Sequence, residues 1–315
     1  MVHITKGELV GTQLPLPPLN EQKRIVAKIE ELFSELDAGE ESLRRARHQL
    51  GIYRQSLLKQ AFEGKLTAHW RTQNHDHAAA WKEVDVADVL TAKPNNGRSV
   101  KDRKGGFKVL RLTAIKEGII DLAEHKEGDW SESEAKPWIV KSGDFLASRG
   151  NGSIKLVGRG GIVRESADVA FPDTMIRLPL DLSLVFPKYF SHLWNSDRVR
   201  HQIEGSARTT AGIYKINQGL LVQYRVPLPS LPEQQEIVRL LDEQFEAISR
   251  NEQEIAAALK RSESLRQSIL KRAFTGRLVP QDPADEPAPA LLARIQSERT
   301  ASPKPARKRT SGKSV

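Results

Sequence analysis

The chain of 315 residues contains no cysteine. This absence excludes disulfide bonds, thiolate metal sites and cysteine nucleophiles, and it fits a reducing compartment. The sequence also has no uncharged apolar run of about 18 residues, so we expect no transmembrane helix. The first residues, Met1 to Lys6, lack the apolar run of a signal peptide. We therefore expect a cytoplasmic protein that does not bind a membrane.

Catalytic motifs are also missing. There is no Asp-Pro-Pro-Tyr or Asn-Pro-Pro-Tyr motif for methylating a base amino group, and no Gly-x-x-x-x-Gly-Lys-Ser/Thr loop for a nucleoside triphosphate. Pro172-Asp173 could begin a nuclease motif, but no Asp/Glu-x-Lys follows it. The His-rich cluster His69, His75, Asp76 and His77 lies in a polar linker, which does not favour a metal site. We predict a non-enzymatic protein without cofactor or metal.

The net charge of +9 is unevenly distributed. Lys and Arg outnumber Asp and Glu by 24 to 19 in residues 71–230 and by 7 to 4 in residues 279–315. Residues 1–70 carry 10 against 9, and residues 231–278 carry 8 against 8. A basic domain is typical of proteins that bind polyanions such as nucleic acid. An ordinary solvated surface is the alternative explanation.

One segment occurs twice, because residues 4–66 align without a gap onto residues 216–278 with 25 identities in 63 positions. Both copies share a Pro-Leu-Pro entry, then Glu-Gln and Ile-Val, and near the end Arg-Gln-Ser, Ala-Phe and a glycine. In the first copy these features begin at Pro15, Glu21, Ile25, Arg54, Ala61 and Gly64. In the second copy they begin at Pro227, Glu233, Ile237, Arg266, Ala273 and Gly276. A repeat of this length indicates two copies of one structural element. The unique segment between them should therefore carry the function.

Each copy predicts an extended entry followed by a long helix. Proline disfavours helix in the residue before it, and the apolar residues that follow recur at steps of three and four over about 40 residues, which is typical of a coiled-coil seam. Gly64 and Gly276 should end the two helices. Antiparallel pairing within the chain is our first expectation, with dimerisation as the alternative. The polar residues that interrupt the seam, such as Glu40 and Arg266, could set register or dock a partner.

The central segment predicts a mixed domain rich in strands. Short apolar runs around residues 109–112, 145–148 and 175–178 are punctuated by glycines and indicate strands. One helix is expected from Pro187 to about Glu204. The glycines between residues 150 and 161 should form tight turns, which could also cradle a phosphate. We therefore predict an α+β fold in which a strand-rich recognition domain is flanked by two long helices that form an antiparallel coiled coil.

We divide the chain accordingly into residues 1–70 (strand end plus long helix), 71–230 (recognition domain), 231–278 (second long helix) and 279–315 (basic tail). The tail contains a short helical pattern around Leu291 to Ile295 and then becomes poor in apolar residues. Such a composition predicts disorder.

The two helix motifs, and the segments Val140–Leu146, Ser148–Ser153, Leu156–Arg159 and Ala207–Ile213 between them, resemble specificity subunits of type I restriction–modification systems. In that family two target recognition domains alternate with two long helices, and a two-part DNA target is recognised. The resemblance covers residues 1 to about 280. The chain begins shortly before the first proline motif, so we expect one recognition domain, which would recognise half of a target.

The resemblance implies a set of partners. These are double-stranded DNA, a modification subunit that binds S-adenosylmethionine and methylates adenine, and a restriction subunit that translocates DNA with ATP and cleaves it. The second half of the target would come from another specificity chain or from a second copy of this chain.

Candidate DNA contacts follow from side-chain chemistry, since Arg pairs with guanine, Asn with adenine, and Lys, Ser and Thr with phosphates. The best candidates lie in the predicted loops of the central segment: Arg149, Asn151, Ser153, Lys155, Arg159, Arg208, Thr209, Thr210, Tyr214 and Lys215. Arg111 and Lys116, near the first predicted strand, come next. Asn151, between two glycines, could equally be a turn residue. The alternative function is a coiled-coil scaffold that has lost sequence-specific binding, and a free-standing nuclease is a more distant third.

Overall fold

The computed structural model describes residues 14–75, 80–210 and 212–301. The chain divides into two compact units. The helical unit is formed by Met1–His48 together with Asn251–Val315, and the mixed unit is Gln49–Arg250. Both boundaries fall inside long helices, so each of these helices contributes one segment to each unit.

The two long helices are α2 (Leu19–Phe62) and α8 (Leu231–Phe274), each of 44 residues. Both end in the same backbone motif, in which a glycine with positive φ stops the helix. Gly64 has a φ of 74° and Gly276 a φ of 67°. The next N–H in each case donates to the carbonyl five residues back, from Lys65 at 2.9 Å and from Arg277 at 2.8 Å. The predicted helix ends are therefore confirmed.

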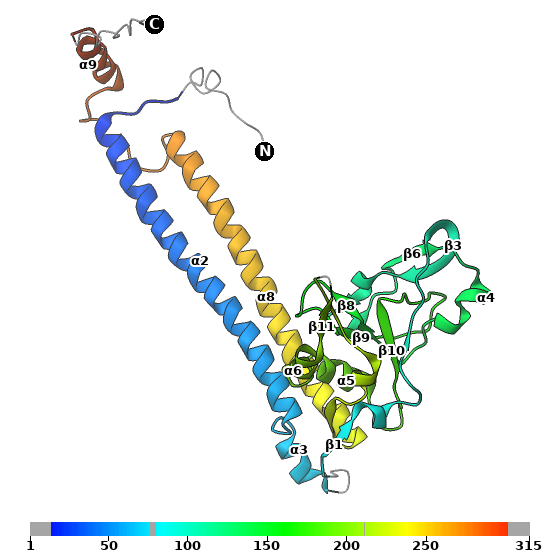
Figure 1. The fold of residues 1–315 in the computed structure, drawn as a ribbon. Coiled ribbons are helices and arrows are strands. Elements are labelled where there is room, and N and C mark those ends of the chain that lie inside the picture. The colour runs from blue at the N-terminus through cyan, green and yellow to red at the C-terminus, as the bar shows by residue number, and fades with distance from the viewer. Residues whose placement is uncertain (1–13, 76–79, 211, 302–315) are drawn as a thin grey trace, which may run out of the picture. The chain divides into compact units, whose positions relative to one another are not determined.

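Segments of α2 and α8 run antiparallel in each unit (Figure 1). In the helical unit, Glu40 accepts a hydrogen bond from Ser262 (2.8 Å) and pairs with Arg266 (3.3 Å), which also pairs with Asp37. Ser262 is buried. Two of the polar interruptions of the seam thus bind each other, which is the arrangement of a layer that fixes register.

The mixed unit repeats this antiparallel pairing with different side chains. The Tyr53 hydroxyl donates to Gln244 Oε1 at 3.2 Å, and the guanidinium of Arg54 lies over the Phe245 ring, 5.1 Å from its centroid. The order of the partners shows the antiparallel direction in each unit. In the helical unit Asp37 pairs with Arg266 and Glu40 with Ser262, and in the mixed unit Tyr53 pairs with Gln244 and Thr67, just after α2, with Glu233. The predicted antiparallel coiled coil is confirmed.

A six-stranded sheet forms the centre of the mixed unit, with strand order β2-β10-β7-β9-β5-β4. The β5–β9 pair is parallel, and the other neighbours are antiparallel. The strands are β2 (Asn95–Asn96), β4 (Ile115–Lys116), β5 (Ile119–Ile120), β7 (Asp144–Ser148), β9 (Gly160–Ile162) and β10 (Met175–Pro179). The predicted strands around residues 145–148 and 175–178 are confirmed.

Three smaller sheets and several short helices complete this unit. Strand β1 (Lys82–Asp85) pairs with β13 (Arg225–Leu228) in one sheet, and β3 (Asp102–Leu110) pairs with β6 (His125–Gly128) in another. The third sheet consists of β8 (Gly150–Asn151), β11 (Arg208–Thr210) and β12 (Ile213–Lys215). The α-helices are α3 (Ala68–Gln73), α4 (Glu132–Ala135), α5 (Pro187–Trp194), α6 (Asp197–Ser206) and α7 (Gln218–Leu221), and in the helical unit α9 (Ala288–Ala301) follows α8. Short 3-10 turns at Val86–Val89, Leu112–Ala114 and Lys136–Trp138 connect these elements.

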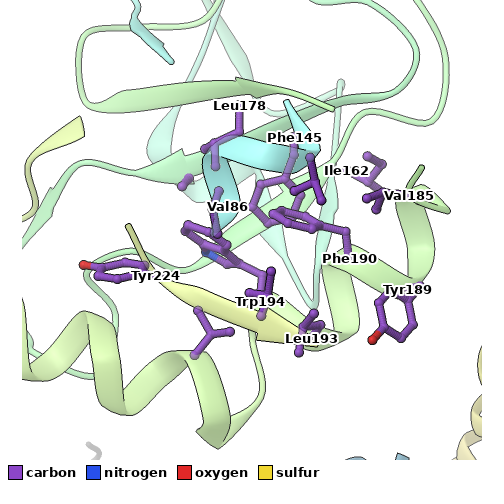
Figure 2. Packing of buried hydrophobic residues seen from close by; sticks show 14 of the residues in the cluster. Val86, Phe145, Ile162, Leu178, Val185, Tyr189, Phe190, Leu193, Trp194 and Tyr224 are labelled. Atoms are coloured by element: carbon purple, nitrogen blue, oxygen red, sulfur yellow. The ribbon is translucent and has the colours of Figure 1, made fainter. Parts of the chain in front are cut away.

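The aromatic side chains of α5 pack on the central sheet (Figure 2). Phe190 and Trp194 contact Phe145 of β7, with ring centroids 5.1 and 5.5 Å apart. The two polar atoms that this packing buries are satisfied, since Trp194 Nε1 donates to Gly158 O (2.7 Å) and the Tyr189 hydroxyl to Pro227 O (2.9 Å). Buried aromatic groups thus anchor α5 and, through Pro227, the start of the α8 entry segment.

The single helix expected from Pro187 to Glu204 is wrong, because the structure has two helices with a break at Asn195–Ser196. Asn195 donates through Nδ2 to Gly160 O (2.9 Å) and accepts through Oδ1 from Gly160 N (3.2 Å). This contact with strand β9 is made across the fold, so a helical pattern read along the chain does not contain it.

Candidate nucleic-acid interface

The small sheet of β8, β11 and β12 collects many of the predicted DNA contacts. Thr209, Tyr214 and Asn151 are direct neighbours across its three strands. Arg208, Lys215 and Gly150 form the adjacent row. Because directly opposed residues in antiparallel strands point to the same face, each row presents its side chains together. Thr210 lies opposite Ile213 in the same register.

A basic cleft of about 580 Å³ opens beside this sheet. Its lining carries three cationic side chains and three side-chain amides but no acidic group: Asn96, Arg149, Ser206, Arg208, Lys215, Ile216, Asn217, Gln218 and Leu220. The cleft draws these residues from five elements (β2, α6, β11, β12 and α7), from the link between β7 and β8, and from the link between β12 and α7. We call it the basic cleft below.

Two cations of the basic cleft stand side by side. Arg208 and Lys215 are exposed and stand directly opposite each other on neighbouring strands. Like charges in such a pair destabilise a sheet. Within the described part of the chain, neither has an acidic group within ion-pair distance. Arg149 is half-buried, and its Nη1 donates to Asp173 O at 3.4 Å. A phosphate bound here would relieve the repulsion.

The turn that follows β8 positions four further candidates. Asn151 Oδ1 accepts from Ser153 N at 3.0 Å, so this asparagine does build a turn. Ser153 O in turn accepts from Leu156 N and Val157 N. Arg159 Nε donates to Lys155 O at 3.0 Å, and both side chains are exposed. These contacts fix the loop, and they leave the Lys155 and Arg159 charges facing solvent.

Arg111 and Lys116 lie apart from the basic cleft. Lys116 is held between Asp121 (2.8 Å) and Glu124 (2.9 Å), and the hydrogen bonds that its ammonium group donates to these two carboxylates raise the pKa of Lys116. Arg111 is exposed and donates through Nε to His125 O at 3.3 Å. Both remain predictions as DNA contacts, and the ion pairs of Lys116 would have to open for it to contact a phosphate.

Two of the glycines expected in tight turns, Gly160 and Gly161, lie in a strand instead and have a packing explanation. A Cβ on Gly160 would lie 2.3 Å from the Phe145 ring, and one on Gly161 would lie 2.7 Å from the Ile119 backbone. Both residues belong to β9, inside the central sheet. These two glycines thus allow close strand packing, and neither lines the basic cleft.

Two cleft residues, Asn96 and Gln218, were not predicted from the sequence. They are 122 positions apart, and their side chains lie 2.6 Å from each other. Neither belongs to a run of candidate residues, so the sequence offers no signal that they meet. They come together because β2 pairs with β10 at one edge of the central sheet, while α7 follows β12.

The described residues contain no group of three or more His, Asp or Glu side chains able to hold a metal ion. Of the predicted His-rich cluster, Asp76 and His77 lie outside these residues. No helix within the same ranges combines the length and apolarity needed to cross a membrane.

No known family profile matches the chain. Three curated relatives are similar over most of its length. The EcoKI specificity subunit of Escherichia coli (strain K12) is 32% identical over 92% of this chain and 64% of its own length, and the StySPI subunit of Salmonella potsdam is 30% identical over 92% and 64%. The EcoBI subunit of Escherichia coli is 30% identical over 95% of this chain and 67% of its own length.

Solved structures show the same fold at lower sequence identity. A chain from a structure of type I R-M complex assembly and conformational transition aligns with a TM-score of 0.65 at 21% identity, over 87% of this chain and 64% of the other. The HsdS subunit from Thermoanaerobacter tengcongensis aligns with a TM-score of 0.52 at 20% identity, over 88% and 64%.

The sequence similarity to the curated subunits, together with the repeated helices that bracket a mixed domain, defines the class of protein. The chain belongs to the family of type I restriction enzyme specificity subunits. It spans about 64% of the length of the first two curated relatives. The resemblance inferred from the sequence motifs is confirmed.

Proposed function

We propose that the mixed unit recognises one half of a bipartite DNA target and that the chain itself catalyses no reaction. The observation that carries this proposal is the basic cleft, in which Arg149, Arg208 and Lys215 converge without an acidic group. Cations supply the phosphate contacts that hold a protein in register on DNA, and neighbouring side chains supply base contacts. The Thr209–Tyr214–Asn151 row lies on the same small sheet.

The paired helices would hold the modification subunit. On the α2 segment of the mixed unit, Ile52 is 58% exposed and Tyr53 is 45% exposed. Large apolar side chains that remain exposed on a rigid helix are suited to binding another protein. The modification subunit would bring S-adenosylmethionine and methylate adenine, and the restriction subunit would join that complex. The helices themselves would set the distance to a second recognition domain.

Selection from a random duplex library tests this function. The full chain, co-expressed with its modification subunit, is incubated with the library at near-physiological salt, and bound duplexes are sequenced. A short enriched motif is expected. A two-fold symmetric split motif would mean that two copies assemble, and one half-site would mean that a single recognition domain acts. No enrichment from a soluble complex would contradict sequence recognition and favour the scaffold alternative.

Lys260→Ala is a matched control for the charge effect. Lys260 is an exposed lysine on α8 in the helical unit. Its removal should leave the enriched motif and the affinity unchanged, whereas Arg208→Ala should weaken binding to every duplex. Equal losses in the two variants would indicate binding by net charge alone.

A further inference from the structure

The Asn96 backbone is fixed at one edge of the basic cleft. Asn96 pairs with Ile176 of β10, and Trp138 Nε1 donates to its carbonyl at 3.1 Å. The adjacent Gly97 N donates to Met175 O at 3.2 Å. Asn96 therefore sits on a strand whose position is set by the central sheet. A recognition residue held by a rigid element keeps its geometry before a ligand arrives.

The basic cleft contains three side-chain amides, and one of them is already committed. Asn217 Oδ1 accepts from Gly219 N at 2.7 Å and caps α7. Asn96 and Gln218 instead contact each other at 2.6 Å. With its nitrogen toward Pro94 O (3.2 Å), the Gln218 amide oxygen accepts from Asn96 N at 3.1 Å, and it accepts from the Asn96 side chain when that amide turns its nitrogen toward Gln218.

Asn96 retains hydrogen-bonding capacity after this pairing. An amide has two N–H donors and an oxygen with two lone pairs. The contact with Gln218 uses one donor or one lone pair, depending on the orientation of the two amides, so Asn96 keeps at least one N–H and one lone pair in either case. A neighbouring donor and acceptor on one amide match N7 and N6 of adenine in the major groove.

The cations of the basic cleft lie beside this amide. Arg208, Lys215 and Arg149 share the cleft with Asn96 and Gln218. A nucleotide offers both groups that this lining requires, since its phosphate is an anion and its base edge carries hydrogen-bond donors and acceptors. A purely anionic small ligand would leave the amide unused.

We propose that Asn96 reads an adenine in the half-site, that Gln218 is a positioning residue that orients the Asn96 amide, and that Arg208 and Lys215 hold a backbone phosphate nearby. This inference rests on the proposed DNA-recognition function. It adds to that function one residue that reads a base.

The test compares duplex-library selections by the full chain with those by two variants, each co-expressed with the modification subunit. Wild type should enrich a motif that contains an adenine position. Asn96→Ala should make that position degenerate, leave the others unchanged, and weaken binding to the best wild-type duplex by about 5- to 150-fold, the worth of one bidentate base contact. Asn96→Asp removes the donor, so the preference at that position should shift from adenine toward cytosine, whose N4 donates to a carboxylate.

The shift of preference separates base recognition from loss of structure, because an unfolded variant enriches nothing at any position. Asn251→Ala, at an exposed asparagine on α8, is the matched control and should keep the wild-type motif. If wild type enriches a motif and both Asn96 variants reproduce it, the assignment of Asn96 is overturned while DNA recognition stands. If wild type enriches no motif, the proposed function fails and this inference fails with it.

Discussion

The pairing of Arg71 with Glu233 gives the sharpest prediction about stability. Glu233, at the start of α8, has no exposed surface. Its Oε1 accepts from Thr67 Oγ1 (2.6 Å) and from Arg71 Nη1 (2.5 Å), two residues that follow α2. Arg71 also donates to Gly64 O and lies over the Trp81 ring, 5.7 Å from its centroid. The contact thus ties the end of one long helix to the beginning of the other.

Arg71→Met should destabilise the mixed unit by about 2–3 kcal/mol. Removing one partner of a buried ion pair costs about 3–5 kcal/mol because the other charge stays buried without compensation. We expect a loss at or just below the low end of that range, since the Arg71 side chain is 28% exposed and water can approach the vacated position. In the double variant with Glu233→Gln the charge is gone, so its loss should be smaller than that of Arg71→Met by about 1–2 kcal/mol.

Urea unfolding followed by tryptophan fluorescence measures this effect in one unit only. All five tryptophans (Trp70, Trp81, Trp130, Trp138 and Trp194) belong to the mixed unit. Arg103→Met breaks an ion pair with Asp129 that is 69% and 49% exposed, and this control should cost less than about 1 kcal/mol. Equal effects in the two arginine variants, or additive losses in the double variant, would refute the argument from burial.

Three further predictions concern a histidine, two glycines and the cations proposed to contact DNA. Burial lowers the pKa of His192 to about 4; the charge of Asp242 partly opposes this shift, and the charge of Lys188 adds a little to it. As the pH falls, the unfolded chain therefore binds a proton at this histidine before the folded chain does. The free energy of unfolding should fall by at most about 3 kcal/mol between about pH 6.5 and pH 4 and stay level at lower pH. His192→Gln should remove that slope in urea titrations across this pH range, and an unchanged slope would show that other groups cause it. Gly64→Ala should lower the free energy of unfolding by about 1–2 kcal/mol because φ is positive at Gly64. Gly51→Ala, inside α2 with open space around the added methyl group, should raise it by up to about 1 kcal/mol. Effects of the same sign in urea unfolding would contradict this. Arg208→Ala and Lys215→Ala should each lower the slope of log affinity against log salt by about 1 and weaken all duplexes alike, and an unchanged slope in a fluorescence-anisotropy titration would exclude a phosphate contact.

Much of the architecture could be predicted because it depends on residues that are close together in the sequence. The repeated motif carries its own start signal in the proline entry and its own stop signal at Gly64 and Gly276, and both helix ends fall there. Seam periodicity is also local, and it predicted the pairing of the two helices. The strands around Phe145 and Ile176 follow from short apolar runs between glycines.

Features that depend on distant contacts were not predictable in this way. The break between α5 and α6 results from Asn195 binding Gly160, and nothing in the helical pattern shows it. The contact between the Asn96 and Gln218 amides forms only because strand pairing in two different sheets brings β2 and α7 together. Of the predicted DNA contacts, those near β8, β11 and β12 share a sheet because the strands pair, whereas Lys116 lies in a separate ion-pair cluster.

The central claim is that this chain recognises a DNA sequence, and comparison of two duplexes tests it most directly. Equilibrium affinities are measured for the selected duplex and for a scrambled duplex of the same composition, at salt concentrations from about 50 to 200 mM. Both affinities should fall as salt rises, while the selected duplex stays at least about 100-fold tighter throughout. A ratio of one at every salt concentration would contradict sequence recognition and leave only attraction between charges.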